Sequence, residues 1–238
     1  MKSSLVPRVR RALKAVADPA KAPQMQAYMK SEMPYHGVSS PVLAAVCREV
    51  FADYAPADAK TWRDDVLALW RGARFREERY AAIALTGHRA ARSFQTLDAL
   101  PMYEEMIVTG AWWDYVDSLA ANRVGKLLVA YPKEMRKTML AWSKSPDMWK
   151  RRVSILCQLK RRDETDLELL HACIEPSLGS KEFFLRKAIG WALRQLAWTN
   201  PDEVVRYVKE NEDRLSGLSQ REALKNVAPA APRARRRR

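Results

Sequence analysis

The segment KEFFLRKAIGWALRQLAWT, residues 181–199, separates into two faces when its residues are placed at about 100° per residue. One face is the apolar stripe of a helix packed on a core, and it consists of Leu185, Ile189, Ala192 and Leu196. The opposite face carries two cations and two indoles, namely Lys187, Trp191, Arg194 and Trp198. Exposed indoles among cations indicate a ligand or a partner. The alternative is that this face packs against a neighbouring helix pair or the C-terminal helix, which Gly190 would allow to approach closely.

The rest of the chain shows the same helical pattern. It has only 8 Gly, and no segment has the alternation of a strand. Prolines such as Pro41, Pro132 and Pro201 stand near segment starts, where a missing N–H costs little. We predict helices over residues 3–17, 20–32, 41–54, 59–71, 76–91, 95–109, 112–130, 132–143, 147–161, 164–177, 181–199, 201–213 and 219–227. Short connections favour an all-α, right-handed solenoid of stacked antiparallel helix pairs. We expect one domain over residues 1–227 and a disordered, Arg-rich tail over 228–238.

Three residues recur at equal intervals: Trp113, Arg152 and Trp191 are separated by two steps of 39 residues. A solenoid with a repeat of about 40 residues would place them on the same face of successive repeats. The i,i+4 spacing also sets Asp117 beside Trp113 on one side of a helix. The sequence therefore predicts a surface of indole, guanidinium and indole with one carboxylate.

The charge balance points to a polyanionic partner. Lys and Arg outnumber Asp and Glu by 42 to 28, which gives a net charge of +14. Five of these charges belong to arginines in the last six residues, so the rest of the chain keeps 14 − 5 = +9. A phosphate-rich partner is the first expectation, and an anionic membrane surface is the second.

The cysteine and histidine patterns predict neither disulfides nor a metal site. The 3 Cys are odd in number and far apart, and the 3 His are isolated. We expect the cysteines to be reduced and buried, and we expect no cofactor. No N-terminal segment has the apolar core region of a signal peptide, and no run approaches about 18 apolar residues. We therefore expect a soluble, cytoplasmic, nucleoid-associated protein that is monomeric and does not bind a membrane.

The polar candidates each have a structural alternative. Arg152 falls inside an apolar arc, where a guanidinium needs a carboxylate, a carbonyl or a phosphate as its partner. Asp117 stands at the edge of a buried face, so it is either paired, for example with Arg152, or functional. Asp114, on the outer flank, is interpreted as a charge that the helix dipole favours near an N-terminus.

Five segments carry a resemblance to a known family: WWDYVDSLA, MWKRRVSILCQLK, SKEFFLRKAIGWALRQLAWTNPDEV, LSQREALKN and, near residue 30, QAYMKSEMPYHGVSSP. They resemble the AlkD family of bacterial alkylpurine DNA glycosylases. The resemblance spans roughly residues 19–227 in order. It implies a HEAT-like solenoid with a basic concave face for duplex DNA. It also implies hydrolysis of the N-glycosidic bond of N3- and N7-alkylated purines, without a base-flipping pocket and with tolerance of bulky adducts.

The resemblance also implies residue roles. Trp113 and Trp191 match the family's essential aromatics, and Asp117 matches its catalytic carboxylate. Arg152 matches its DNA-contacting arginine. Further DNA-binding candidates are Lys187, Arg194, Tyr28, Ser39 and Lys160. Two positions depart from the family pattern, because Ser39 replaces a longer polar side chain and Ala44 replaces a frequent basic residue.

The chemistry that we expect follows from charge. An alkylated purine is already cationic and leaves without an acid, while Asp117 stabilises the cationic sugar. The sequence offers no lysine suited to a lyase step. One alternative is a helical-repeat protein that binds structured or damaged DNA without cutting it, which would gain nothing from Asp117. Another is a scaffold for an acidic protein partner.

Overall fold

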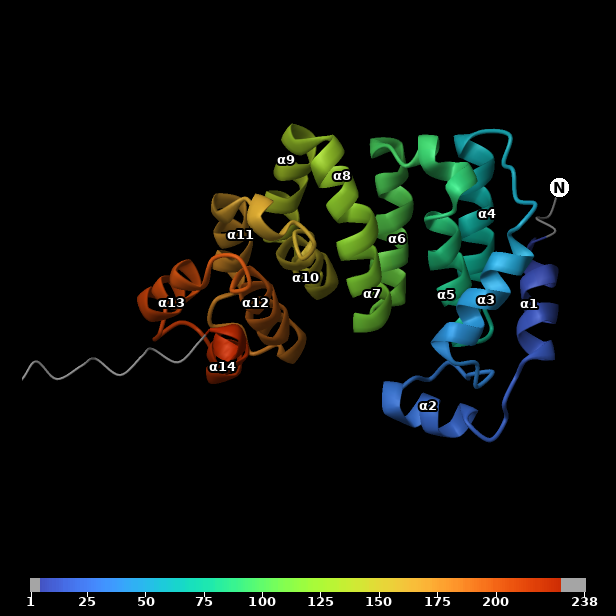
Figure 1. Cartoon of the computed structure of the whole chain (residues 1–238), viewed down its shortest axis with the longest axis horizontal. Coiled ribbons are helices and arrows are strands. Elements are labelled where there is room, and N and C mark those ends of the chain that lie inside the picture. The colour runs from blue at the N-terminus through green and yellow to red at the C-terminus, as the bar shows by residue number, and fades with distance from the viewer. Residues whose placement is uncertain (1–4, 228–238) are drawn as a thin grey trace, which may run out of the picture. The chain divides into compact units, whose positions relative to one another are not determined.

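The computed structural model describes residues 5–227 (Figure 1). The chain divides into two compact units, Met1–Tyr131 and Pro132–Arg238. The prediction of an all-α fold is confirmed, because residues 5–227 form α-helices with short 3₁₀ and π segments and contain no strand. The tail predicted over residues 228–238 lies outside the described residues. None of the helices within residues 5–227 has the length and apolar character needed to cross a membrane.

The N-terminal unit contains the first eight α-helices. They are α1 (Leu5–Ala15), α2 (Ala22–Met29), α3 (Ser40–Val50), α4 (Ala59–Gly72), α5 (Arg76–Thr86), α6 (Leu100–Gly110), α7 (Trp113–Leu119) and α8 (Gly125–Ala130). Helix α4 packs on α5, α5 on α7, and α6 on α7. In Figure 1 these four helices run side by side, and α2 lies crosswise to them. Large aromatic side chains fill the core, including Trp62, Trp70, Tyr103 and Tyr115.

The C-terminal unit contains six further α-helices within the described residues. They are α9 (Pro132–Trp142), α10 (Met148–Leu156), α11 (Leu167–Ile174), α12 (Phe183–Leu196), α13 (Pro201–Glu210) and α14 (Gly217–Ala223). Helix α12 is central, since it packs on α10, α13 and α14. Its predicted core stripe is confirmed, because Leu185, Ile189, Ala192 and Leu196 are all buried.

Local chemistry explains where many of these helices begin. Prolines occupy the first turn of α2, α3, α6 and α13, as expected for a residue without an N–H. Side chains of Asp58, Asp147, Asp166, Asn200 and Ser216 cap α4, α10, α11, α13 and α14 by accepting a backbone N–H. These signals are local in the sequence, and most predicted helices accordingly fall close to the observed ones. Two ranges differ: the helix predicted over residues 76–91 ends at Thr86 and is followed by a 3₁₀ segment, Arg89–Phe94, and the helix predicted over residues 95–109 begins only at Leu100.

The helix predicted over residues 112–130 is interrupted in the structure. A π-helical segment, Ala120–Val124, separates α7 from α8, and the N–H of Gly125 donates to the carbonyl of Ala120. A π turn inserts one residue into the helical register. Side chains beyond residue 119 therefore face different neighbours from those that uniform α-helical spacing predicts.

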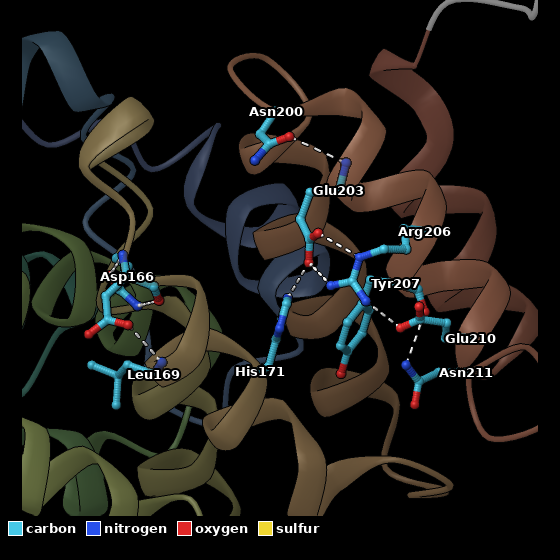
Figure 2. A network of polar contacts seen from close by, with 10 residues as sticks. Asp166, Leu169, His171, Asn200, Glu203, Arg206, Tyr207, Glu210 and Asn211 are labelled. Atoms are coloured by element: carbon cyan, nitrogen blue, oxygen red, sulfur yellow. Dashed lines mark hydrogen bonds and ion pairs between the residues drawn. The ribbon is translucent and has the colours of Figure 1, made fainter.

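Helix α13 is attached to α11 by a polar network (Figure 2). Glu203 lies between His171 and Arg206, with oxygen-to-nitrogen distances of 3.3 and 2.6 Å. The His171 ring stacks on Tyr207 at 4.3 Å between centroids. Burial lowers the pKa of His171, and the nearby Glu203 works against that change. This histidine thus joins two helices, and among residues 5–227 no group of His, Cys, Asp and Glu could hold a metal ion.

The cysteines agree with their predicted state. Cys47, Cys157 and Cys173 are free and buried. Burial raises the pKa of the Cys47 thiol to about 11 and that of the Cys173 thiol to about 12. They are therefore inert core residues rather than nucleophiles.

Candidate functional site

The chain turns sharply before the first candidate residues. Helix α6 ends at Gly110, and the C-cap residue Ala111 adopts a left-handed conformation with φ of 42°. Gly110 allows Trp70 to come close, because an added Cβ would lie 2.9 Å from the indole atom Cζ2. Trp112 is extended, so α7 begins at Trp113. Asp117 lies one turn further along α7, as predicted.

Asp114 belongs to a buried polar cluster in the N-terminal unit. Its carboxylate accepts a hydrogen bond from Arg76 at 2.6 Å and another from the hydroxyl of Tyr80. The hydroxyls of Tyr80 and Tyr35 are 3.1 Å apart. Burial opposes the charge of Arg76, but hydrogen bonds to Asp114 and Tyr80 hold its pKa above the ordinary value.

This cluster corrects one sequence interpretation. Asp114 does lie in the first turn of α7, but its side chain is only 13% exposed and pairs with Arg76, which is 6% exposed. It is therefore not on an outer flank. The spacing of residues along α7 gave no signal of this pairing, because Arg76 lies on α5, 38 residues before Asp114.

Trp113 lines a pocket of about 740 Å³ in the N-terminal unit. The pocket is lined by Gln24, Met25, Tyr28, Met29, Tyr35, Val38, Ser40, Leu43, Tyr80, Ile83, Ala84, Trp113, Asp114, Ser118 and Arg123. The fold thus brings together Trp113 and Tyr28, two residues that the sequence analysis selected separately. Tyr28 is 77% exposed, which leaves its ring available to a ligand. Ser39 is exposed at the start of α3, next to the pocket residue Ser40.

The loop between Tyr28 and Ser39 is fixed to the start of α5. The buried carboxylate of Glu77 accepts hydrogen bonds from the backbone N–H groups of residues 36–38, at 2.9–3.0 Å. Gly37 has a φ of +82°, and a Cβ there would overlap a backbone oxygen. Sequence reasoning missed Glu77, whose only signal was its place in an acidic pair at the start of a helix. This anchor holds one side of the pocket.

In the C-terminal unit, the predicted burial of Arg152 is confirmed. The residue is 4% exposed, on α10, and its guanidinium donates to the backbone carbonyl of Phe184 at the start of α12. The guanidinium carbon also lies 5.9 Å from the centre of the Phe184 ring. A carbonyl partner was one of the three options open from the sequence. The role of Arg152 in DNA contact stays a prediction.

The polar face of α12 converges on Glu222 of α14. The carboxylate of Glu222, 9% exposed, receives Lys187 at 3.1 Å, Arg194 at 2.6 Å and Lys225 at 2.6 Å. Hydrogen bonds from Lys225 and then Lys187 lower its pKa to about 2. The sequence analysis selected Lys187 and Arg194 but missed Glu222, because nothing in the local pattern marks it.

The indoles of α12 differ in exposure. Trp191 is half-buried, whereas Trp198 is 69% exposed.

The expected close approach at Gly190 is confirmed, since a Cβ there would lie 2.5 Å from the Cβ of Glu222. Lys160, the remaining DNA-binding candidate, is exposed just after α10. Lys187 and Arg194 both pair with Glu222 of α14, as the packing alternative predicted, and their contact with DNA stays a prediction.

The positions of the candidates in the element order agree with a two-helix repeat. Trp113 begins α7, Arg152 lies in α10 and Trp191 lies in α12. When α7 and α8 are counted as one helix interrupted by the π-helical segment, α9 lies between it and α10, and α11 lies between α10 and α12. On this count, the interval of 39 residues corresponds to alternate helices. Their predicted common surface stays a prediction.

Comparison with known proteins gives the family. The model of the DNA alkylation repair enzyme family matches residues 9–227. Among solved structures, the chain is similar to one described as a predicted DNA alkylation repair enzyme from Enterococcus faecalis, with 28% sequence identity and a TM-score of 0.78. The similarity covers 90% of this chain and 98% of that one. No match was found among curated proteins. Since the family model spans nearly the whole chain, the protein belongs to the DNA alkylation repair enzyme family.

Proposed function

We propose that the protein is a monofunctional alkylpurine DNA N-glycosylase that acts on N3- and N7-alkylated purines in duplex DNA. The observation that carries this proposal is the arrangement on α7, in a member of a DNA alkylation repair family. Trp113 lines an open pocket, and Asp117 follows one helical turn later. An aromatic surface beside a carboxylate suits a sugar that becomes cationic during the reaction.

The reaction needs little acid catalysis. Alkylation at N3 or N7 gives the purine a positive charge, so the bond between C1′ and N9 breaks with its electron pair moving to the base. The base leaves neutral, and the deoxyribose becomes an oxocarbenium ion. The oxygen of a water molecule then bonds to C1′, and the proton released passes to the surrounding water. The products are an abasic site and a free alkylpurine.

Each candidate has a role in this reaction. Asp117 stabilises the positive charge on the sugar and orients the attacking water. Trp113 and Trp191 stack along the sugar and the backbone, where they add a cation–π contribution. Arg152, Lys187, Arg194, Tyr28, Ser39 and Lys160 contact the DNA strand. Recognition proceeds through the backbone around the lesion, so bulky N7 adducts are substrates as well.

The decisive experiment compares wild type with Asp117→Asn under single-turnover conditions. The substrate is a duplex with one N7-methylguanine, and hot alkali converts each abasic site into a strand break. We expect wild type to produce breaks and Asp117→Asn to lose a factor of about 10²–10³ in rate. Affinity for the duplex should persist, because the carboxylate acts mainly in the transition state.

Asp98→Asn is the matched control, because Asp98 is exposed and outside the pocket lining and its substitution changes the net charge equally. This variant should excise at the wild-type rate. Excision by Asp117→Asn within about twofold of wild type would remove the catalytic role of Asp117. Absence of excision by wild type, together with tight binding to the duplex, would favour a non-catalytic DNA-binding protein.

A further inference from the structure

The π-helical segment changes which side chain reaches the pocket beside Trp113. Asp114 and Ser118 both line the pocket and are one α-helical turn apart. In an unbroken α-helix, Asn122 would follow Ser118 on that face. The π turn at residues 120–124 adds one residue, and Arg123 lines the pocket instead. Such π segments occur frequently at functional sites.

Arg123 is fixed in position without a carboxylate. Its Nε donates to the hydroxyl of Thr86 at 2.7 Å, and its Nη1 donates to the carbonyl of Asn122 at 3.1 Å. No ion pair joins Arg123 to an acid within residues 5–227. Burial lowers the pKa of its guanidinium, so the surroundings do not compensate for the lost hydration. An anionic ligand would compensate for it.

Gly87 leaves the space that this guanidinium occupies. A Cβ at residue 87 would lie 1.8 Å from Nη2 of Arg123. The fold thus uses a glycine at the end of α5 to admit an arginine from the π segment. The glycine and the π-helical segment are separate features of the fold, and both are consistent with the position of this guanidinium at the pocket.

The pocket combines this cation with aromatic walls. Among the described residues that line the pocket, Arg123 is the only basic one, and the only acid, Asp114, is already paired with Arg76. The rings of Tyr28, Tyr80 and Trp113 also line the pocket. A cation beside aromatic surfaces fits a phosphodiester with its attached sugar and base.

We propose that Arg123 binds a phosphate of the DNA strand whose sugar packs against Trp113. This inference rests on the proposed function, because it takes DNA as the ligand. It adds to that function a phosphate contact in the N-terminal unit, positioned by the π segment. A guanidinium binds a phosphate through two parallel N–H groups, and Nη2 has no hydrogen-bond acceptor within residues 5–227.

The test measures the affinity for a labelled, unmodified duplex at 50, 100 and 200 mM salt. We expect Arg123→Gln to raise Kd by about fivefold or more and to reduce the slope of log K against log salt by about 0.9. Arg71→Gln is the matched control, since Arg71 is 61% exposed, pairs with Glu105 and does not line the pocket. It loses the same charge and should change Kd by less than about twofold.

A purely structural role of Arg123 is distinguished from DNA binding by the melting temperature of the variant and by a second variant. Arg123→Gln should melt within a few degrees of wild type without DNA. If Arg123→Gln is less stable than this, Gly87→Ala provides the test of DNA binding. The added methyl group displaces the flexible end of Arg123 while the net charge stays the same. This variant should also weaken binding. A stable Arg123→Gln protein that binds the duplex with wild-type affinity would overturn the proposal. If Arg123→Gln is unstable, wild-type affinity of Gly87→Ala would overturn it.

The outcomes also separate this inference from the proposed function. Wild type that binds the duplex through Arg123 but excises nothing leaves the phosphate contact standing and removes the glycosylase. Normal excision with unchanged Kd in Arg123→Gln removes only the phosphate contact. Wild type that does not bind duplex DNA overturns the phosphate contact. Thermal stabilisation by micromolar inorganic phosphate that depends on Arg123 would assign a small-anion site and also overturn the DNA assignment.

Discussion

Asp114 and Asp117 lie on the same short helix, but their surroundings differ. Asp114 turns inward to Arg76 and Tyr80, and together these residues join α7 to α5. Asp117 is half-buried one turn after Trp113, where we propose that it acts on the sugar. A pairing that joins two helices and a charge that we propose for catalysis thus lie about one turn apart. Their substitutions should affect different measurements.

Asp114→Asn should lower the free energy of unfolding by about 3 kcal/mol or more, because it leaves the buried Arg76 without its carboxylate. Urea denaturation at pH 7 measures this loss. At a temperature where Asp114→Asn is fully folded, its excision rate should fall far less than that of Asp117→Asn. Unchanged stability would show that the Arg76–Asp114 pair contributes little.

At the scale of elements, α12 and α14 meet at a glycine. The Cβ of Ala at position 190 would lie 2.5 Å from the Cβ of Glu222 and 3.0 Å from the carbonyl of Ser219. Neither atom is the end of a flexible side chain. The close approach of the helices therefore depends on Gly190, despite the poor helix propensity of glycine.

Gly190→Ala should destabilise the protein by about 1–3 kcal/mol, because the two helices must separate. This loss should exceed the gain of about 1 kcal/mol that alanine gives within a helix. Gly72→Ala, at the end of α4, is the control, because its added Cβ meets nothing closer than 3.9 Å. Chemical denaturation of both variants provides the comparison. A more stable Gly190→Ala protein would contradict the packing argument.

The same helix contact should depend on pH through Glu222. Its pKa falls from 4.5 to about 2 in the folded protein, chiefly through the hydrogen bond from Lys225 and then that from Lys187. A lowered carboxyl pKa stabilises the fold above pH 4.5, and this stabilisation is lost as the pH falls towards 2. Glu222→Gln should therefore cost about 1–3 kcal/mol at pH 7 and progressively less below pH 4.5. Denaturation at pH 7 and pH 3 measures both values, and an equal loss at both would exclude the electrostatic explanation.

For the whole molecule, the net charge of +14 favours DNA phosphate in general, and residues 229–238 contribute five arginines to it. Deleting these ten residues should lower the affinity for unmodified duplex and reduce the slope of log K against log salt. Single-turnover excision at saturating protein should be unchanged, since the candidate site lies elsewhere in the sequence. Loss of excision at saturation would show that the tail belongs to the reaction itself.

The sequence predicted the elements well and the contacts of particular side chains poorly. The helices, the stripe of α12, the burial of Arg152 and the beginning of α7 near Trp113 all follow from signals within a few residues. The pairing of Asp114 with Arg76, and that of Glu222 with Lys187 and Arg194, joins residues 28 to 38 positions apart. Spacing along one helix carries no information about such partners.

The amino-acid sequence by itself determined an all-α fold with helices close to the observed ranges, because apolar periodicity, prolines and capping residues act locally. Only the tertiary structure decided that Asp114 pairs with Arg76, that Trp113 and Tyr28 line one pocket, and that Arg123 takes the place of Asn122 there. A π turn is one residue away from an α turn, and packing against neighbouring helices selects between them. Positions that depend on distant neighbours are therefore fixed only when the helices assemble.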